Sequence, residues 1–301
     1  MAGMKKILEC VPNFSEGRDL KIIEKIVDPF RKTDGVKLLD CQTDADHNRC
    51  VVTVVGEPNP LKKSVIQSMG IAIDLIDMRS HSGQHPRMGA IDVVPFIPVK
   101  NITMDEAVDV SKAVAQQAAD AYRLPIFLYE QSAAIPGRQN LAAIRKGQFE
   151  GMAKKIKELD WVPDFGPAEI HPTAGVTAMG ARMPLVAYNV NLDTRDIEIA
   201  NQIARSVRHI SGGLRYCKGI GIELKDRGIV QVSLNMTDYT RTALYRVFEL
   251  IKIEAQRWGV NVIGSEVIGL VPMQAMIDCA EYYLGIENFS MEQVLETRIY
   301  E

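Results

Sequence analysis

The chain has 301 residues, of which 47% are hydrophobic and 24% are charged, a composition typical of globular proteins with a sizeable core. Its net charge of −3 provides no overall positive field for nucleic acid, and no apolar stretch approaches the roughly 18 residues that a membrane span needs. The N-terminal residues lack the apolar core of a signal peptide, and the five cysteines are odd in number and show no Cys-x-x-Cys spacing. We therefore expect a reduced, cytoplasmic protein of two domains that binds neither nucleic acid nor membranes.

The first part of the chain predicts strand, helix, strand, strand, helix, strand. Asp19 can cap the first helix, which places Leu20, Ile23, Ile26 and Val27 on one face. This order is the split βαβ or ferredoxin-like pattern. The expected strands are residues 7–11, 36–39, 50–55 and 90–99; the first expected helix begins at Asp19, and the second spans residues 58–77.

Further elements extend this first unit. A capping box of Thr103 and Glu106 opens a helix that runs to about Tyr122. A strand at 125–129 and a helix at 142–159, interrupted near Gly147, follow. Residues 161–183 contain several prolines and glycines, which favour an ordered loop lining a pocket between two domains over a passive linker.

The second part of the chain repeats the same order of elements. Asp193 or Thr194 can cap its first helix, and residues 225–228 form the turn of a hairpin. We therefore predict an α+β fold of two βαββαβ subdomains, residues 1–181 and 182–301. The expected strands are residues 184–192, 214–224, 229–234 and 260–267, and the expected helices begin near 194, 240 and 273.

Residues 78–98 contain the most reactive combination of side chains. His81 and His85 stand four apart, but Gly83 and Pro86 make a helix improbable, so the spacing does not predict a metal pair on one helix face. Solvated or structurally bonded histidines are one alternative. Neighbouring arginines for anionic groups and an aspartate that can orient an imidazole favour a catalytic loop instead; these residues are Arg79, Arg87 and Asp92.

Two other polar segments are candidates for ligand contacts. Residues 12–17 form a polar turn between a strand and a helix, which suits either an anion or a simple chain reversal. Residues 40–49 hold three aspartates and a histidine, but they lack the glycine and terminal glutamate of a calcium loop. No nucleophile motif or phosphate loop stands out. The residues therefore favour acid–base chemistry by histidine on an anionic small molecule.

Four motifs resemble the formiminotransferase domain family: residues 11–17, 81–96, 161–167 and 267–272. The resemblance covers nearly the whole chain. It implies two ferredoxin-like subdomains with a folate-binding cleft or tunnel between them, and a homodimer. It also implies transfer of the formimino group of N-formimino-L-glutamate to N5 of tetrahydrofolate, a co-substrate, with no metal. The chain stops before the cyclodeaminase domain of the animal proteins could begin, so we expect the stand-alone form.

The resemblance also implies particular residues. The family's catalytic histidine, in His-Pro-Arg-Met-Gly, corresponds to His85. The folate-binding loop corresponds to Gly166, Pro167, Ala168, Glu169, Ile170, His171, Pro172, Thr173, Ala174 and Gly175. Three of these residues differ from the animal version: His171, Thr173 and Ala174. We therefore expect folate contacts from the backbone of this loop more than from its side chains.

Both substrates carry carboxylates, which guanidinium groups bind in bidentate pairs. Asp40 or Asp92 is a candidate for orienting the imidazole. The candidate substrate-binding residues are Asn13, Asp40, Arg49, Arg87 and Arg182.

Two other functions are compatible with the sequence. One is a related folate enzyme that uses a formyl donor or cyclises 5-formyltetrahydrofolate. The other is a non-catalytic module that binds folate or RNA, against which stand the negative net charge and the lack of an aromatic strand motif interleaved with basic residues.

Overall fold

The computed structural model describes residues 5–299, and the chain divides into two compact units, Met1–Arg182 and Met183–Glu301. Residues 1–4, part of the N-terminal stretch without a signal-peptide pattern, and residues 300–301 lie outside the described residues. Each unit contains one sheet, which confirms the predicted α+β class. No helix within residues 5–299 is long and apolar enough to cross a bilayer.

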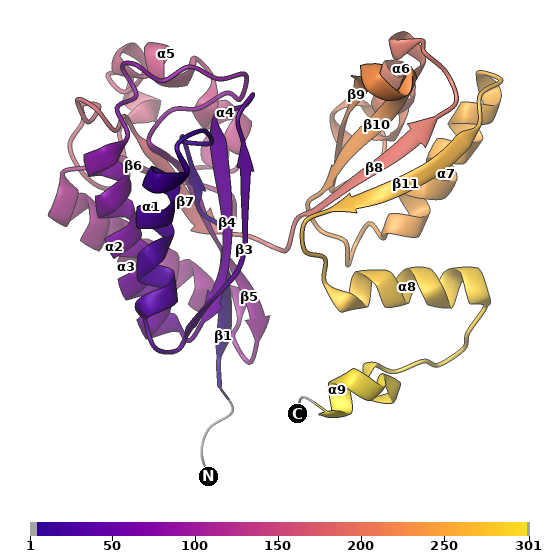
Figure 1. The fold of residues 1–301 in the computed structure, drawn as a ribbon, viewed down its shortest axis with the longest axis horizontal. Coiled ribbons are helices and arrows are strands. Elements are labelled where there is room, and N and C mark those ends of the chain that lie inside the picture. The colour runs from indigo at the N-terminus through magenta and orange to yellow at the C-terminus, as the bar shows by residue number, and fades with distance from the viewer. Residues whose placement is uncertain (1–4, 300–301) are drawn as a thin grey trace. The chain divides into compact units, whose positions relative to one another are not determined.

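The sheet of the first unit has seven strands (Figure 1). Strands β1 and β2 both pair with β4 and β5, so they act as one interrupted strand. The order is therefore β3, β4, β1/β2, β5, β7, β6, with β7 parallel to β5 and β6 and the other neighbours antiparallel. The strands are β1 (Ile7–Cys10), β2 (Asn13–Phe14), β3 (Val36–Asp44), β4 (Arg49–Gly56), β5 (Ile91–Lys100), β6 (Ile126–Leu128) and β7 (Thr177–Ala181).

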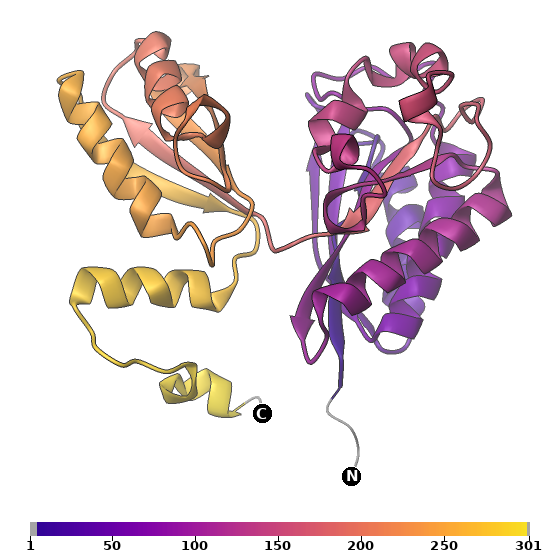
Figure 2. The same cartoon turned by 180° about the vertical axis from the view of Figure 1, so that it is seen from behind.

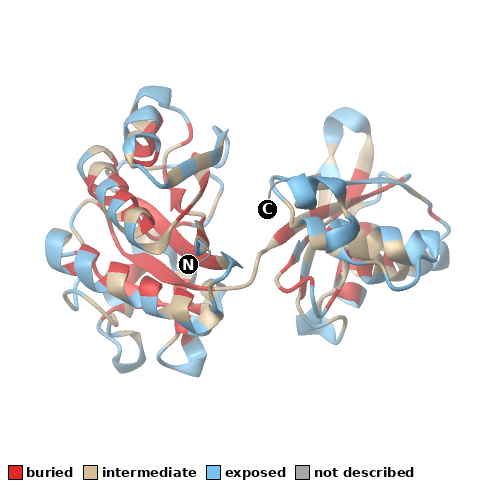
Figure 3. Ribbon diagram, turned by 90° about the horizontal axis from the view of Figure 1, so that it is seen from below, coloured by how far each residue is buried: buried red, intermediate tan, exposed pale blue. Residues whose placement is uncertain are grey.

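Three long helices cover one face of this sheet (Figure 1): α1 (Leu20–Lys32), α2 (Pro58–Leu75) and α3 (Met104–Tyr122). Alternate strand residues such as Val52, Val54 and Val94 point into the core beneath them. Seen from behind, α3 packs along β5 and β7 (Figure 2). Buried residues concentrate in the strands and on the inward sides of the helices (Figure 3).

A second, smaller core lies on the opposite face of the first sheet. It contains Val93 and Ala178, whose neighbours Val94 and Met179 belong to the main core, so the two clusters take alternate residues of the same strands. Two short helices complete it, α4 (Leu141–Arg145) and α5 (Gln148–Lys155). These two helices therefore lie over the β5, β7 and β6 end of the sheet.

The second unit has four antiparallel strands in the order β11, β8, β10, β9. Its core joins this sheet to α6 and α7. The elements are β8 (Val186–Leu192), α6 (Ile197–Val207), β9 (Cys217–Leu224), β10 (Ile229–Met236), α7 (Leu244–Arg257), β11 (Val262–Ile268), α8 (Met273–Leu284) and α9 (Leu295–Ile299). Single turns of 3₁₀ helix lie at Glu130–Ser132, Pro136–Arg138, Leu159–Trp161, His209–Ser211, Lys225–Arg227 and Met291–Gln293.

Three elements differ from their predicted form. The strand predicted at 36–39 continues to Asp44, because Cys41 to Asp44 pair with β4. The segment predicted as a loop at 161–183 contains β7, a fully buried strand of small residues. Helix α6 is capped by Asp196, and Asp193 instead accepts hydrogen bonds from Asn261. The capping box of α3 and the helix break at Gly147 are confirmed.

Candidate active site

The loop between α2 and β5, residues 76–90, is called the histidine loop here. Two hydrogen bonds fasten it to the β3–β4 turn: the Gln84 backbone N–H donates to Asp46 O at 3.2 Å, and the Asn48 side-chain amide donates to Ser82 O at 3.0 Å. The side-chain oxygen of Asn48, Oδ1, accepts the Gly17 N–H at 3.0 Å. Asn48 is buried and has a positive φ, a conformation that asparagine tolerates better than most residues. Three chain segments therefore meet at this residue.

His81 has a structural role in this loop. Its Nε2 lies 3.0 Å from the carbonyl oxygen of Asn48, and its Nδ1 lies 3.2 Å from Nε of Arg87. A carbonyl only accepts and an arginine N–H only donates, so the imidazole must be neutral with its proton on Nε2. Burial, followed by the Arg87 charge, lowers the pKa of His81. This histidine is therefore unsuited to exchanging protons with a ligand.

Arg87 is buried, and all five of its N–H donors are used within the protein. Besides His81 Nδ1, they reach the carbonyl oxygen of His81, Gln148 Oε1, and both carboxylate oxygens of Glu150 at 2.7 and 2.9 Å. The histidine loop is thus tied to α5. The structure places Arg87 as a support of this loop, with no donor left over for a substrate carboxylate.

His85 differs from His81 in having both ring nitrogens unused among residues 5–299. Its ring is half-buried and lies edge-on to that of His47, with centroids 6.5 Å apart. His47 is held by Asp44, whose Oδ2 lies 2.7 Å from Nδ1. Burial, and then the charges of Arg49 and Arg145, lower the pKa of His85 to about 3. The imidazole is therefore neutral near pH 7 and able to accept a proton.

Arg49 begins β4 and is half-buried beside His85. Its guanidinium makes no hydrogen bond or ion pair with any group in the described residues, although burial, followed by the Arg145 charge, lowers its pKa. A desolvated cation without a partner is costly unless a ligand supplies the opposite charge. Arg49 is therefore suited to binding an anionic group next to the neutral imidazole.

Asp92 and Arg145 form a pair that local sequence patterns cannot reveal. Arg145, the last residue of α4, donates from Nε and Nη2 to Oδ2 of Asp92, the former at 2.8 Å. The other oxygen of Asp92 accepts the Met88 N–H at 2.9 Å. Both carboxylate oxygens are thus engaged away from His85. Arg145 was absent from the candidates, because no local pattern in the sequence distinguishes it from other arginines.

The predicted folate loop, residues 166–175, lies partly against the histidine loop. Its last five residues form a tight hairpin in which the N–H groups of His171 and Gly175 each donate to the other's carbonyl. Carbonyls of Thr173 and Ala174 accept the N–H groups of Met78 and Ala90 at 2.8 and 2.9 Å. His171 Nδ1 accepts the Ala174 N–H at 3.0 Å, so its ring stabilises the hairpin.

The first half of the loop is more exposed. Gly166 has a φ of +84° and packs against the carbonyl of Leu124. Glu169 lies 3.9 Å from Arg123 on the surface. Exposed positions available to a ligand are Gly166, Ala168, Glu169 and Pro172, and Pro167, Ile170, His171 and Thr173 are half-buried.

Gly175 is expected to tolerate no side chain. Its φ is +71°, and an added Cβ would lie 2.3 Å from the carbonyl oxygen of Met88. We expect Gly175→Ala to lower the free energy of unfolding by about 1–3 kcal/mol. Gly151→Ala in α5, where nothing lies within 4 Å, is the matched control and should be neutral or raise it by about 0.5–1 kcal/mol. Urea unfolding of both variants measures this, and equal midpoints would refute it.

Of the remaining candidates, Asn13 lies nearest the site, because it pairs with Val51 and Val93, whereas Asp40 pairs with Thr53 further along β4. The Asn13 amide donates to Val11 O within the interrupted strand, and Asp40 accepts from Cys41 N and Gln42 Nε2, both at 2.8 Å. Arg182 follows β7; its N–H donates to Phe96 O and its side chain bonds the Tyr129 hydroxyl. With a rise of about 3.3 Å per residue, Phe96 is roughly 17 Å along β5 from Ile91, so the backbone of Arg182 is not beside the histidine loop.

The described part of the chain contains no group of three or more histidine, cysteine, aspartate or glutamate side chains arranged to hold a metal ion. Around the histidine loop, the described residues bring together a neutral imidazole with free nitrogens and an unpartnered guanidinium. These are the features of an acid–base enzyme that acts on an anionic small molecule.

Comparison with known proteins identifies the family of this chain. Residues 7–182 match the model of the formiminotransferase domain, N-terminal subdomain, and residues 187–299 match that of the formiminotransferase domain. The chain therefore belongs to the formiminotransferase domain family, as the sequence motifs predicted.

Individual relatives cover nearly the whole chain. A glutamate formimidoyltransferase of Streptococcus pyogenes serotype M1 is 55% identical over 297 residues, which are 98% of this chain and 99% of that protein. One of Thermoplasma acidophilum is 42% identical, covering 97% of both. A formimidoyltransferase-cyclodeaminase of Rattus norvegicus is 41% identical over 303 residues, which are 98% of this chain but 56% of that longer protein.

Proposed function

We propose that this protein is a glutamate formimidoyltransferase, which transfers the formimino group of N-formimino-L-glutamate to N5 of tetrahydrofolate and releases L-glutamate. The family and the near-complete coverage of two relatives of that name support this proposal. The observation that carries it within the site is the free, neutral imidazole of His85 beside the unpartnered guanidinium of Arg49.

His85 is proposed as the general acid and base. N5 of tetrahydrofolate attacks the amidine carbon, a new N5–C bond forms, and N5 loses its proton to the imidazole. The tetrahedral intermediate then collapses: the bond from carbon to the glutamate nitrogen breaks, and the imidazolium returns the proton to that nitrogen. One proton is taken and one is given back, so a single histidine serves both steps without any metal.

The charges around His85 link substrate binding to this proton transfer. In the free protein, Arg49 and Arg145 oppose protonation of the imidazole. A substrate carboxylate on Arg49 would offset one of these charges and raise the pKa of His85 toward the range in which a general base is efficient. The catalyst is then activated only when the anionic donor is bound.

The loop Gly166 to Gly175 is proposed to bind the folate. Its hairpin is fastened to the histidine loop by backbone hydrogen bonds, so a folate held by its exposed backbone would have a fixed position relative to His85. Of the other candidates, Arg49 is the best placed for a carboxylate, whereas Arg87 is proposed to support the loop. Asn13, which pairs with Val51 and Val93, is proposed to contact substrate near Arg49, and Asp40 and Arg182 are proposed to contact it further along the sheet.

A coupled assay tests the function. The protein is mixed with tetrahydrofolate and either formiminoglutamate or a formyl donor, and acid then converts any 5-formimino product to the absorbing methenyl form. Product from the formimino donor alone, without ATP, is the expected result. Product only from the formyl donor, or only with ATP and 5-formyltetrahydrofolate, would transfer the assignment to another folate enzyme; tight folate binding without product would indicate a binding protein.

Both units are proposed to be ferredoxin-like subdomains, with 1–181 and 182–301 as their extents. In the second unit the four strands lie in the order fourth, first, third, second, and the first unit repeats this order with β5, β1/β2, β4 and β3. In the first unit, β6 and β7 then extend the sheet beyond β5.

A homodimer in the cytoplasm is proposed as the working form. Helix α8 buries only Ala275 within its own chain and exposes large apolar residues, which favours contact with a second copy. Its exposed residues include Met273, Met276, Tyr282, Tyr283 and Leu284. The five cysteines are free thiols, as a reducing compartment requires. Light scattering of the purified chain measures the mass in solution.

A further inference from the structure

A buried carboxylate connects α4 to the histidine loop. Asp92 is 1% exposed, and its two oxygens face two different segments. Oδ2 accepts two N–H groups of Arg145, and Oδ1 accepts the Met88 N–H at 2.9 Å. Met88 stands three residues after His85. The position of this part of the loop is therefore set by a side chain from a helix more than fifty residues further along the chain.

The end of α4 is itself held firmly. Helices of five residues are not stable alone, and the last carbonyls of any helix lack partners within it. Lys155 of α5 donates to the carbonyl oxygens of Ala143 and Ile144 at 2.6 and 2.8 Å, and its Nζ lies 3.7 Å from the centre of the Trp161 ring. A cation at a helix C-terminus is favourable, so Lys155, which also contacts the Trp161 ring, stabilises the last turn of α4, where Arg145 lies.

Arg145 also acts on the reactive groups through its charge. The charged and titratable groups that face His85 are Arg49, Arg145, His47 and Asp44, and the first three oppose its protonation. Arg145 likewise lowers the pKa of Arg49, after burial. The ion pair with Asp92 uses Nε and Nη2 of Arg145, and the Arg145 charge still opposes protonation of the imidazole.

We propose that Arg145 is a positioning residue for His85: through Asp92 and the Met88 amide it holds the histidine loop in place, and it keeps a fixed positive charge beside the imidazole. The inference rests on the proposed function and deepens it. It explains why the candidate orienting carboxylate, Asp92, does not contact the imidazole. Arg145 would orient the loop that carries the base, and the substrate would remain in contact with His85 and Arg49.

The test uses a double variant, Arg145→Met with Asp92→Asn, since removing the arginine alone would leave a buried carboxylate unpaired. We expect kcat to fall by about 10- to 100-fold, the loss typical of a displaced catalytic group, with the KM of the formimino donor little changed. The NMR titration of His85 should move upward toward the ordinary histidine value. Arg145→Lys, which keeps the charge and Asp92, should recover part of kcat and most of the titration shift.

Arg31→Met with Glu24→Gln, a surface pair on α1, is the matched control and should change neither quantity. Unchanged kcat and titration in a folded double variant would overturn the proposal, as would a raised KM with unchanged kcat, which would make Arg145 a substrate-binding residue. If the double variant does not fold, Arg145→Lys decides: kcat equal to that of the wild type in spite of a fall in thermal stability would overturn the proposal. If wild type transfers no formimino group, the proposed function fails separately, and the His85 titration alone decides this proposal.

Discussion

Replacing His85 with alanine is expected to lower kcat by about 10²- to 10⁴-fold, with KM values for both substrates close to those of the wild type. The imidazole is the group with free nitrogens in the site, and its loss removes proton transfer without removing the groups proposed to bind either substrate. The measurement is the methenyl absorbance assay under saturating donor and tetrahydrofolate. Turnover equal to the wild type would exclude His85 as the acid and base.

Two controls make this result specific. His209→Ala changes an exposed histidine of the second unit and should leave turnover unchanged. Thermal unfolding of the His85 variant should match the wild type at neutral pH, where the ring makes no hydrogen bond among residues 5–299. The pH dependence of stability should differ: the native wild type keeps His85 neutral down to about pH 3, whereas the unfolded chain protonates it near 6.5, so stability falls as the pH drops through that range. The variant should lose that contribution.

Arg49→Gln is expected to raise the KM of the formimino donor by about 10- to 100-fold, because a hydrogen bond to a charged group contributes about 1.5–3 kcal/mol. The KM of tetrahydrofolate should change less. The variant should also raise the pKa of His85, because one of the two guanidinium charges that lower it is gone. Steady-state kinetics with each substrate varied, and an NMR titration of the histidines, measure the two effects.

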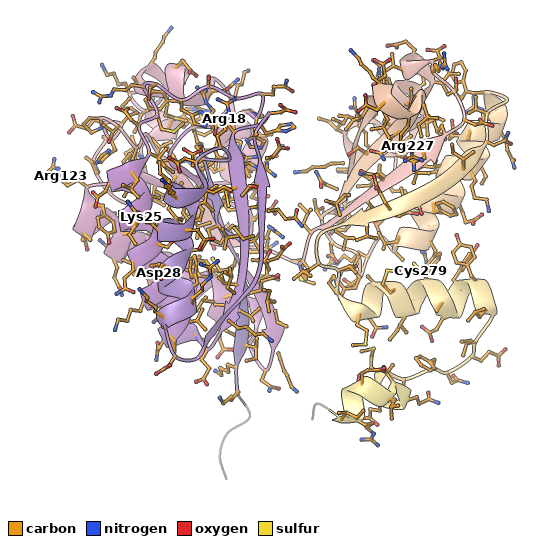
Figure 4. The ribbon with its side chains drawn as sticks, in the orientation of Figure 1. Arg18, Lys25, Asp28, Arg123, Arg227 and Cys279 are labelled. Carbon is orange, nitrogen blue, oxygen red and sulfur yellow. The ribbon has the colours of Figure 1, made fainter. Side chains whose placement is uncertain are left out.

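Binding of the donor carboxylate at Arg49 is predicted to raise the pKa of His85, and the pH dependence of the same kinetics checks the direction of this change. In the wild type, the pH profile of kcat/KM reports the free protein, so kcat/KM should begin to fall only at low pH. The profile of kcat reports the bound complex, so kcat should begin to fall at a higher pH. Arg227→Gln, at the β9–β10 turn (Figure 4), is a suitable control and should behave as the wild type. A donor KM that Arg49→Gln leaves unchanged would contradict the assignment of Arg49.

Much of the fold could be predicted because its signals are local. The capping box at Thr103, the apolar periodicity of α2 and the glycine at the hairpin turn each act over a few residues. Strand β7 was missed because Ala178, Gly180 and Ala181 have weak strand propensity, and the strand owes its conformation to burial between β5 and β6. The polar end of β3 was missed because its solvent-facing residues resemble a loop.

The candidate site divides in the same way. His85 could be singled out from its motif, and the structure separates it from His81 by the partners of each ring. The engagement of Arg87 with Glu150, 63 residues away, and of Asp92 with Arg145, 53 residues away, could not be predicted. No local pattern marks which distant charge will become a neighbour, so an arginine available to a substrate cannot be distinguished in sequence from one that is already paired.

The histidine loop meets its neighbours through backbone in direct contact with backbone. A methyl group on Gly83 would lie 2.2 Å from the carbonyl oxygen of His47, and one on Gly89 would lie 2.1 Å from that of Val176. At these two positions the glycines leave no room for a side chain between the backbones. The loop, the β3–β4 turn and the start of β7 should therefore move as a single block during ligand entry and release. Slow opening motions, if turnover requires them, would have to arise outside this block. Laboratory evolution of donor preference should succeed sooner at the exposed residues of these loops than at the glycines where their backbones meet.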